Sequence, residues 1–295
     1  YFYDQRGSEL FEQITLLPDY YPTRAERRIL SRRVDEVIAA APRFTSLVEL
    51  GSGSSSKTPL LLDAMQRRGV AESYVPVDVS VHALAGAVDD LRETYPSLPI
   101  HGVVTDFERP LNTLPMMGGR MVALLGSTIG NLEPPARARF LKNVVEALAP
   151  GESFLLGVDL VKDTERLLKA YDDAAGTTRL FNLNMLKVLN RLLRADFDTS
   201  RFDHVALWNE EQSRIEMRLR ARGAMKVRLD LLDAVIAFED GEEIRTEIST
   251  KFRRETLESE FNTVGLELAG WWDDRESPAV NGPGGDYAVV LGVRA

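Results

Sequence analysis

VELGSGSSSK, residues 48–57, is the stretch that decides the fold. Ser46–Leu50 is typical of a buried strand, and Lys57–Gly69 has helical spacing, so the stretch is a strand-to-helix turn. Its two glycines, Gly51 and Gly53, allow the backbone to turn tightly and to approach a ligand closely. Two glycines alone do not separate a ligand-binding loop from an ordinary turn.

Helical and strand patterns alternate on both sides of this turn. Thr23-Arg24-Ala25-Glu26 fits a capping box, in which Thr23 and Glu26 satisfy backbone N–H groups at the start of a helix that extends to about Ala41. Ser80 is placed to cap the helix that follows the second strand. Such alternation predicts a parallel sheet, because each parallel connection needs a crossover. The further elements are strands at Tyr74–Val79, Ile100–Thr105, Met121–Leu125 and Phe154–Leu160 and a helix at about Pro135–Leu148.

The pattern changes after Asp159. Two helices, at about Thr164–Ala174 and Arg179–Arg194, precede segments that alternate as antiparallel strands do. Those segments are Val205–Trp208, Arg214–Leu219, Lys226–Leu232 and Ile244–Lys251. The elements expected to complete the first sheet are a helix at Glu255–Val264, strands at Leu266–Trp272 and Tyr287–Val293, and a hairpin loop at Pro278–Gly285.

These elements predict two domains. We expect an α/β domain with a mostly parallel, Rossmann-like sheet at residues 25–160 and 251–295. It is interrupted by an inserted α+β domain at residues 161–250, which we expect to bind the substrate. Residues 1–24 are expected to join the inserted domain.

The composition excludes several classes of protein. The 295 residues carry a formal net charge of -9 and show no basic stripe that could neutralise phosphates, so no nucleic-acid partner is expected. Cysteine is absent, and the three histidines (His82, His101 and His204) lack metal-ligand spacing, so no metal is expected. No apolar run approaches the ~20 residues that span a bilayer, so no membrane partner is expected. The absence of cysteine fits a reducing cytoplasm, and we expect a cytoplasmic monomer. Tyr1 lies within a patterned segment, so we expect the natural chain to begin further upstream.

Three further features follow the carboxyl ends of expected strands, where open α/β sheets bind ligands. Asp78 ends the second strand, where a carboxylate can accept both hydroxyls of a ribose. Asp106 and Phe107 end the third strand, where they can accept an adenine amino group and pack against its ring. The glycine loop carries Lys57, which can pair with a cofactor carboxylate, in place of the phosphate-binding pattern of a dehydrogenase.

The loop also resembles that of class I methyltransferases. Glu49 stands at the position of their acidic residue before the turn, although Ser55 stands where a third glycine is usual. The combination predicts a class I methyltransferase that binds S-adenosyl-L-methionine and releases S-adenosyl-L-homocysteine.

Seven segments spread over the whole chain resemble one family. Together they are similar to the actinobacterial L-histidine Nα-methyltransferases, which trimethylate histidine to hercynine in ergothioneine biosynthesis. Because the resemblance includes the inserted domain, it is more specific than a shared fold. The segments are YFYDQRGSELFEQITLLPDYYPTR (1–24), VELGSGSSSKT (48–58), LGSTIGNL (125–132), LLGVDLVKD (155–163), AYDDAAG (170–176), RIEMRLRA (214–221) and TEISTKF (246–252).

The resemblance implies roles for residues at the matching positions. The residues that would hold S-adenosyl-L-methionine are Gly51, Lys57, Asp78, Asp106 and Phe107. Those that would hold the backbone groups of L-histidine are Tyr20, Asn131 and Tyr171, while Glu247 and Ser249 would bind the imidazole with Met217 packed beside it. Tyr3 would lie near the reacting amine, and Tyr3 and Asn131 are the candidate catalytic residues. Departures occur at Thr250, where actinobacterial relatives have cysteine, and in the longer loop around Pro278–Gly285.

The residues alone leave simpler interpretations of these positions open. Tyr20 and Tyr21 also suit surface or core aromatics, and Asn131 suits a turn. Glu247 and Ser249 lie two apart on an expected strand, so they point to one face, but an alternating polar face is usually solvated. These residues are site candidates through the resemblance and not through their spacing.

Two other functions remain open. One is N-methylation of a tryptophan-type amino acid, which Glu247 and Met217 disfavour because an indole needs more room and less charge. The other is a binding or regulatory protein that keeps the fold without turnover, which the intact set of cofactor residues disfavours.

Overall fold

The computed structural model describes residues 4–42, 44–107, 111, 118–275 and 285–295. Contacts divide the chain into two compact units, which are described separately. The large unit comprises Pro22–Val161 and Lys251–Ala295, and the inserted unit comprises Tyr1–Tyr21 and Lys162–Thr250. These boundaries lie close to residues 25, 161 and 251, where the sequence pattern predicts them, while the role of each unit stays a prediction.

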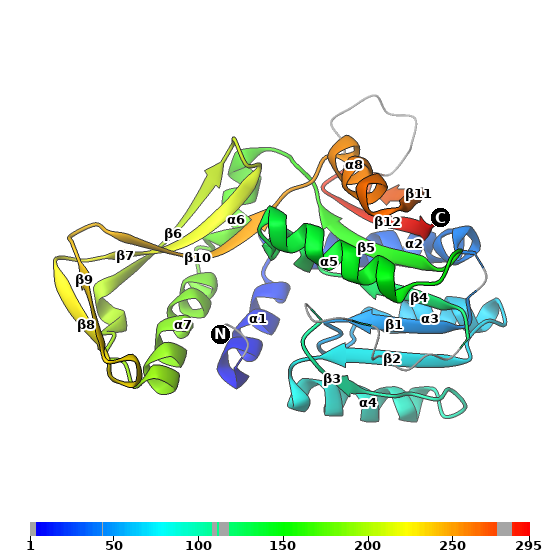
Figure 1. Cartoon of the computed structure of the whole chain (residues 1–295), viewed down its shortest axis with the longest axis horizontal. Coiled ribbons are helices and arrows are strands. Elements are labelled where there is room, and N and C mark those ends of the chain that lie inside the picture. The colour runs from blue at the N-terminus through cyan, green and yellow to red at the C-terminus, as the bar shows by residue number, and fades with distance from the viewer. Residues whose placement is uncertain (1–3, 43, 108–110, 112–117, 276–284) are drawn as a thin grey trace. The chain divides into compact units, whose positions relative to one another are not determined.

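A seven-stranded sheet of the described residues forms the centre of the large unit, in the order β11-β12-β5-β4-β1-β2-β3 (Figure 1). Neighbouring strands from β5 to β3 are parallel, whereas β12 is antiparallel to both of its neighbours. The predicted α/β class with a mostly parallel sheet is therefore confirmed. The strands are β1 (Ser46–Leu50), β2 (Ser73–Asp78), β3 (Val103–Val104), β4 (Arg120–Leu124), β5 (Ser153–Asp159), β11 (Leu266–Asp273) and β12 (Tyr287–Arg294).

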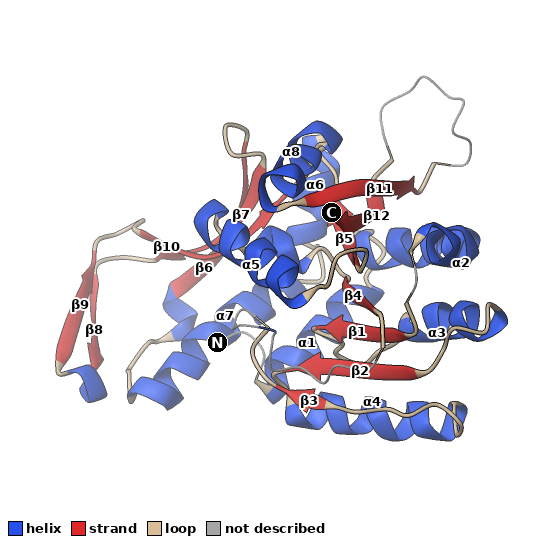
Figure 2. Ribbon diagram, turned by 45° about the vertical axis from the view of Figure 1, so that its right-hand side comes forward, coloured by secondary structure: helices blue, strands red, loops and turns tan. Residues whose placement is uncertain are grey.

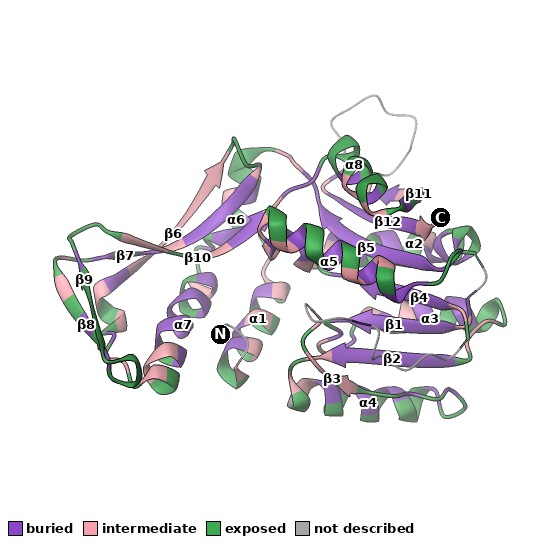
Figure 3. Ribbon diagram, viewed as in Figure 1, coloured by how far each residue is buried: buried purple, intermediate pink, exposed green. Residues whose placement is uncertain are grey.

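Helices cover both faces of this sheet. Leu47 and Met121 pack in one cluster with α2, α3 and α4, whereas their chain neighbours Val48 and Val122 pack in another with α5 and α8. Successive side chains on a strand point to opposite faces, so the central strands are buried along their length, as Figure 3 shows. The helices are α2 (Pro22–Ala40), α3 (Thr58–Arg67), α4 (Val81–Thr94), α5 (Pro134–Ala147) and α8 (Arg254–Val264).

The start of α2 differs from the predicted capping box. The helix begins at Pro22, which suits the first helical position because proline lacks the N–H that has no partner there. Thr23 therefore lies inside the helix, and the Glu26 side chain is fully buried in the large unit instead of reaching back to the helix start. The capping-box prediction was wrong, whereas the predicted cap of α4 is confirmed, because Ser80 accepts from the backbone N–H of Ala83 (3.3 Å).

The third strand is shorter than predicted. Regular pairing with β2 covers only Val103–Val104, with one isolated bridge between Tyr74 and Ile100. Among the described residues, β3 is the last strand at its edge of the sheet and pairs with β2, and the intervening His101 and Gly102 are exposed. A strand held from one side and open to solvent keeps fewer ladder bonds than a central one.

The inserted unit has an antiparallel sheet in the order β10-β7-β6 and a separate β8–β9 hairpin (Figure 2). The predicted helices and antiparallel strands of this region are present. The strands are β6 (Phe202–Asn209), β7 (Arg214–Ala221), β8 (Met225–Leu229), β9 (Ala234–Phe238) and β10 (Glu243–Thr250), and the helices are α1 (Gln5–Leu16), α6 (Thr164–Tyr171) and α7 (Thr177–Leu193).

Two elements of the inserted unit were not predicted from the pattern. Asp4 caps α1 by accepting from the N–H of Gly7 (2.8 Å), and it also accepts from Asn184 (2.8 Å) and Arg191 (2.8 Å) of α7. The other element is β9, whose apolar run is largely exposed, with Val235 at 60% and Ile236 at 41%. Such a run lacks the alternation that marks a half-buried strand.

Lys251 and Asp159 form a buried ion pair of 2.8 Å in the large unit, with side-chain exposures of 0% and 1%. We expect Lys251→Met to reduce the free energy of unfolding by about 3–5 kcal/mol, because it leaves a buried carboxylate without its cation. Urea unfolding measures the difference. The control is Lys142→Met, at an exposed pair with Glu146, which should change stability by less than about 1 kcal/mol. Equal losses of unfolding free energy in the two variants would contradict the conclusion that Lys251 stabilises the fold by pairing with Asp159.

Candidate functional site

The loop between β1 and α3 turns through three left-handed residues. Gly51, Gly53 and Ser55 have φ angles of 64°, 50° and 52°. Ser55, which stands where a third glycine is usual, therefore adopts the conformation that favours glycine, and its hydroxyl lies 3.3 Å from that of Tyr74. Serine at this position thus lies in the same left-handed region as Gly51 and Gly53.

Phe107 lies against this loop. A Cβ atom added to Gly51 would lie 3.5 Å from Cε1 of Phe107, an ordinary contact, so the backbone angle and not lack of space demands glycine there. Phe107 also packs edge-on against Phe140, with ring centroids 5.9 Å apart. Asp106 is exposed beside it. The structure thus brings together the loop and the aromatic side chain that the sequence assigned to one ligand.

Asp78 organises the loop as well. Its carboxylate accepts from the backbone N–H of Gly53 (2.9 Å) and from that of Ser80 (2.8 Å). The bond from Ser80 is typical of an aspartate in a turn. The bond from Gly53 connects the end of β2 to the glycine loop. Asp78 is half-buried, and a carboxylate has lone pairs for further donors.

Glu49 is buried and forms hydrogen bonds within the large unit. It accepts from the hydroxyls of Thr58 (2.6 Å) and Tyr74 (2.6 Å) and is only 3% exposed. Burial raises the pKa of its carboxyl, against the lowering effect of those two bonds. Glu49 therefore holds the start of α3 against β2.

Lys57 contacts a residue to which the sequence pattern gave no functional role. Its ammonium forms an ion pair with Glu26, and the lysine side chain is 16% exposed whereas that of Glu26 is fully buried. Glu26 also accepts from the backbone N–H of Gly126 (2.9 Å) and the hydroxyl of Tyr287 (2.7 Å). In the sequence, the Thr-x-x-Glu spacing was interpreted as a capping box, and that interpretation did not predict the contact of Glu26 with Lys57.

Asn131 ends a short 3-10 helix, Thr128–Asn131, that follows β4. The turn before it contains Gly126 and Ser127, both with positive φ, and the hydroxyl of Ser127 accepts from the N–H of Asp159 (2.9 Å). Asn131 is half-buried in the large unit. The other candidate substrate residues among the described ones belong to the inserted unit.

Those residues form one cluster in the inserted unit. The hydroxyls of Tyr171 and Ser249 are 2.8 Å apart, and the rings of Tyr20 and Tyr171 meet edge-to-face with centroids 6.2 Å apart. Met217 on β7 is the cross-strand partner of Glu247 on β10, and directly opposite residues share one face. The structure therefore brings together Tyr20, Tyr171, Met217, Glu247 and Ser249, which are far apart in the sequence.

A register shift in β10 sets the face of Glu247. The pairing moves by one residue between Arg245 and Glu247, so that Arg245 faces Arg218 while Glu247 faces Met217. The hydroxyl of the intervening Thr246 donates to the carbonyl of Met217 (2.9 Å). Ser249 follows in regular register opposite Ile215, so the predicted shared face of Glu247 and Ser249 is present.

His204 supports Tyr171 from β6. Its Nε2 lies 2.8 Å from the carbonyl oxygen of Tyr171, and its Nδ1 lies 2.9 Å from the side-chain nitrogen of Asn182. Since the amide must donate, Nδ1 accepts and Nε2 donates in this arrangement. The alternation of β6 indicates which face of the strand His204 lies on. It does not indicate the partners of His204, so the contact with Tyr171 could not be predicted from the sequence.

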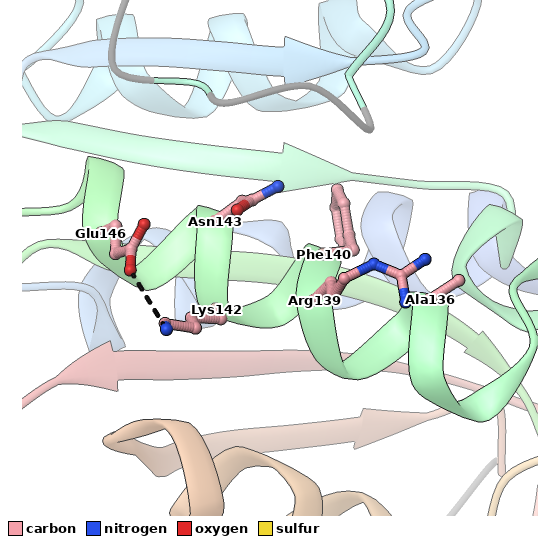
Figure 4. Close-up of a pocket in the computed structure, with 6 residues that line it drawn as sticks. All are labelled: Ala136, Arg139, Phe140, Lys142, Asn143 and Glu146. Atoms are coloured by element: carbon pink, nitrogen blue, oxygen red, sulfur yellow. Dashed lines mark ion pairs between the residues drawn. The ribbon is translucent and has the colours of Figure 1, made fainter.

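Tyr3 and most of the Pro278–Gly285 loop lie outside the described residues. Within the described ranges, no group of three or more acidic, histidine or cysteine side chains is arranged to hold a metal, and no helix is long and apolar enough to cross a membrane. A surface hollow lies along α5, where Figure 4 shows Lys142 paired with Glu146. None of the candidate site residues lines it.

The fold matches known methyltransferases. The crystal structure of an S-adenosylmethionine-dependent methyltransferase from Clostridium acetobutylicum superimposes with a TM-score of 0.53 at 12% identity, covering 97% of this chain and 98% of that one. At this identity the likeness concerns the fold alone. The large unit therefore has the class I methyltransferase fold.

Sequence relatives define the family. The profile of a family described as "Histidine-specific methyltransferase, SAM-dependent" matches residues 1–280. A histidine N-alpha-methyltransferase of Mycolicibacterium smegmatis is 51% identical over all of this chain and 89% of its own length. Ergothioneine biosynthesis protein 1 of Neurospora crassa is 30% identical, over 92% of this chain and 31% of its own length. The chain belongs to the family of histidine-specific, S-adenosylmethionine-dependent methyltransferases.

The face of β7 opposite Met217 carries a buried carboxylate, Glu216, that is 1% exposed. Burial disfavours its charge, but hydrogen bonds from Arg218, Arg214 and Asn209 outweigh burial and lower its pKa to about 2. A lowered folded-state pKa stabilises the fold above the unfolded pKa of ~4.3, and this contribution is lost as the pH falls toward 2.

We expect Glu216→Gln to lower the free energy of unfolding by about 3 kcal/mol at pH 7, and by about half of that at pH 3. Urea unfolding of both proteins across this pH range measures the difference. A loss that is the same at pH 3 and pH 7 would mean that the charge of Glu216 does not stabilise the sheet.

Proposed function

We propose that this protein transfers methyl groups from S-adenosyl-L-methionine to the α-amino nitrogen of L-histidine. The product would be trimethylhistidine, hercynine, for ergothioneine biosynthesis. Support comes from the family and from the names of the two relatives, one a histidine N-alpha-methyltransferase and the other an ergothioneine biosynthesis protein. The observation that carries the proposal is the cluster of Tyr20, Tyr171, Met217, Glu247 and Ser249 on one side of an antiparallel sheet.

The cofactor residues suit the parts of S-adenosyl-L-methionine. Phe107, packed against Gly51, offers a ring face for adenine, and Asp78 offers acceptor oxygens for ribose hydroxyls. Lys57 offers an ammonium for the methionyl carboxylate. When bound, the cofactor supplies a methyl group that its positive sulfur already activates, so no metal is required for the transfer.

Glu247 and Ser249 suit an imidazole. Imidazole has an N–H group and a second ring nitrogen, so a carboxylate can accept from the first while a hydroxyl satisfies the second. The Glu247 Oε2 atom is shielded from solvent. A substrate without a matching donor could not form this hydrogen bond, which would discriminate between substrates. An indole has only one nitrogen and needs more room beside Met217, so the tryptophan-type alternative fits less well.

The tyrosines suit a substrate whose amine is methylated repeatedly. Each transfer removes an N–H donor, and the last leaves a permanent positive charge. Aromatic faces attract a quaternary ammonium without any hydrogen bond, and Tyr20 and Tyr171 offer such faces. The protein's contribution to the reaction would be to hold the nitrogen in line with the methyl group. An α-amino group titrates near or somewhat above physiological pH, so only a modest free energy is needed to supply the neutral amine.

We expect incubation with L-histidine and S-adenosyl-L-methionine to yield mono-, di- and trimethylhistidine. Mass spectrometry of the mixture resolves the three products, and L-tryptophan under the same conditions serves as the control substrate. Methyl transfer to tryptophan but not to histidine would replace the proposal with the tryptophan-type alternative. No transfer to either would favour a binding protein.

We expect Glu247→Ala to weaken histidine binding by about 1.5–3 kcal/mol, the range for a hydrogen bond to a charged group. Titration calorimetry measures the affinity directly. Glu210→Ala is the matched control, because Glu210 is exposed in the turn between β6 and β7 of the same unit. If both variants bind histidine as the unchanged protein does, Glu247 is not part of the site.

A further inference from the structure

Glu26 is a fully buried carboxylate with donors on several sides. Its Oε1 accepts from the hydroxyl of Tyr287 (2.7 Å) and the N–H of Gly126 (2.9 Å). Its Oε2 contacts the Lys57 ammonium and lies 3.1 Å from the same N–H. An ionised carboxylate can be buried only when it is paired and hydrogen-bonded, and these contacts meet that requirement.

The sheet makes room for this carboxylate at a glycine. A Cβ atom added to Gly157 of β5 would overlap Oε1 of Glu26 and lie 2.6 Å from the hydroxyl of Tyr287. Gly157 has no positive φ, so the backbone would accept another residue. Glycine at position 157 therefore leaves room for the carboxylate of Glu26.

Lys57 carries the charged group of this network that lies toward the surface. Its side chain is 16% exposed, whereas that of Glu26 is 0% exposed. Its Nζ lies 3.9 Å from the Cβ position of Gly126, at the turn that follows β4. The ammonium is thus fixed from the interior at the carboxyl edge of the sheet, where such folds bind their ligands.

We propose that Glu26 is a positioning residue that holds the Lys57 ammonium ready for the methionyl carboxylate of S-adenosyl-L-methionine. This rests on the proposed function, which supplies the ligand. The ammonium has three N–H donors, so it keeps Glu26 on one side while it donates to the ligand on the other. Because Glu26 is locked by Gly126 and Tyr287, the lysine is ordered before the ligand arrives.

The effect of removing the Glu26 charge has a definite sign. A lysine side chain that is not anchored loses rotamer freedom on binding, which weakens affinity. Repulsion between Glu26 and the ligand carboxylate acts in the opposite direction. However, the methionyl group carries an ammonium beside its carboxylate, so attraction of one charge offsets repulsion of the other. Loss of anchoring therefore dominates, and the ligand binds more weakly.

The test compares two ligands that differ in the methionyl group. S-adenosyl-L-homocysteine has the carboxylate, and 5′-methylthioadenosine lacks the amino-acid portion but keeps the adenosine. We expect Glu26→Gln to weaken the first about tenfold, the scale of the lost side-chain ordering, and to change the second less than about twofold. Titration calorimetry on the full chain, without histidine, measures both affinities.

Two further variants separate positioning from general damage to the fold. Tyr287→Phe removes one neutral donor to Glu26 but keeps the ion pair and the hydrogen bond from Gly126, so it should change the ratio of the two affinities much less than Glu26→Gln does. Adding Glu26→Gln to Lys57→Met should weaken S-adenosyl-L-homocysteine no further than Lys57→Met alone, because residues that act through one another are not additive.

Equal weakening of both ligands by Glu26→Gln, unchanged affinity, or tighter binding of S-adenosyl-L-homocysteine would each overturn the proposal. If Glu26→Gln does not fold, Gly157→Ala displaces the same carboxylate and must produce the same selective loss, or the proposal fails. Failure of the proposed function has a different signature, because the unchanged protein would bind S-adenosyl-L-homocysteine and still leave histidine unmethylated.

Discussion

The ion pair between Glu26 and Lys57 ties together the parts of the large unit that surround its glycine loop. Glu26 belongs to α2, Lys57 directly precedes α3, Gly126 follows β4 and Tyr287 begins β12. Burial of a carboxylate is unfavourable unless its charge is paired and its oxygens accept hydrogen bonds. The network therefore joins elements that are distant in the sequence, and it fixes the one cation of the loop from the protein interior.

The elements with a strong local pattern are those that the sequence predicted. β1, β4 and β5 are buried on both faces, and strands of this kind are rich in apolar residues and do not alternate. β3 proved shorter because its pairing depends on an exposed edge, which no local pattern encodes. α1 is held by contacts of Asp4 with α7, which is distant in the sequence. β9 pairs with its neighbour β8 in a hairpin, but its exposed apolar run lacks the alternation that would mark it as a strand.

The candidate site was predictable only in part. Gly51, Asp78 and Phe107 follow strand ends, and topology alone directs strand ends to one edge of a parallel sheet. Tyr20, Tyr171 and Ser249 carry no such positional signal, and only the resemblance to a family pointed to them. Glu26 was misassigned, because a Thr-x-x-Glu spacing that matches a local capping box says nothing about which face of the helix is buried.

The register shift in β10 shows why side-chain direction could not be derived from spacing. If the register did not shift, Thr246 would pair with Met217, and Glu247 would pair with Glu216. Two carboxylates would then be directly opposite, which is unfavourable, and Glu247 would lie on the face that carries Glu216, Arg214 and Arg218. The bulge turns Glu247 to the face of Met217 and Tyr171, because a shift of one residue reverses the face of every residue that follows. The same shift puts Ile248 opposite Glu216 and leaves the arginines to neutralise that carboxylate. A single inserted residue thus separates the charged face, which stabilises the sheet, from the face that carries the candidate substrate residues.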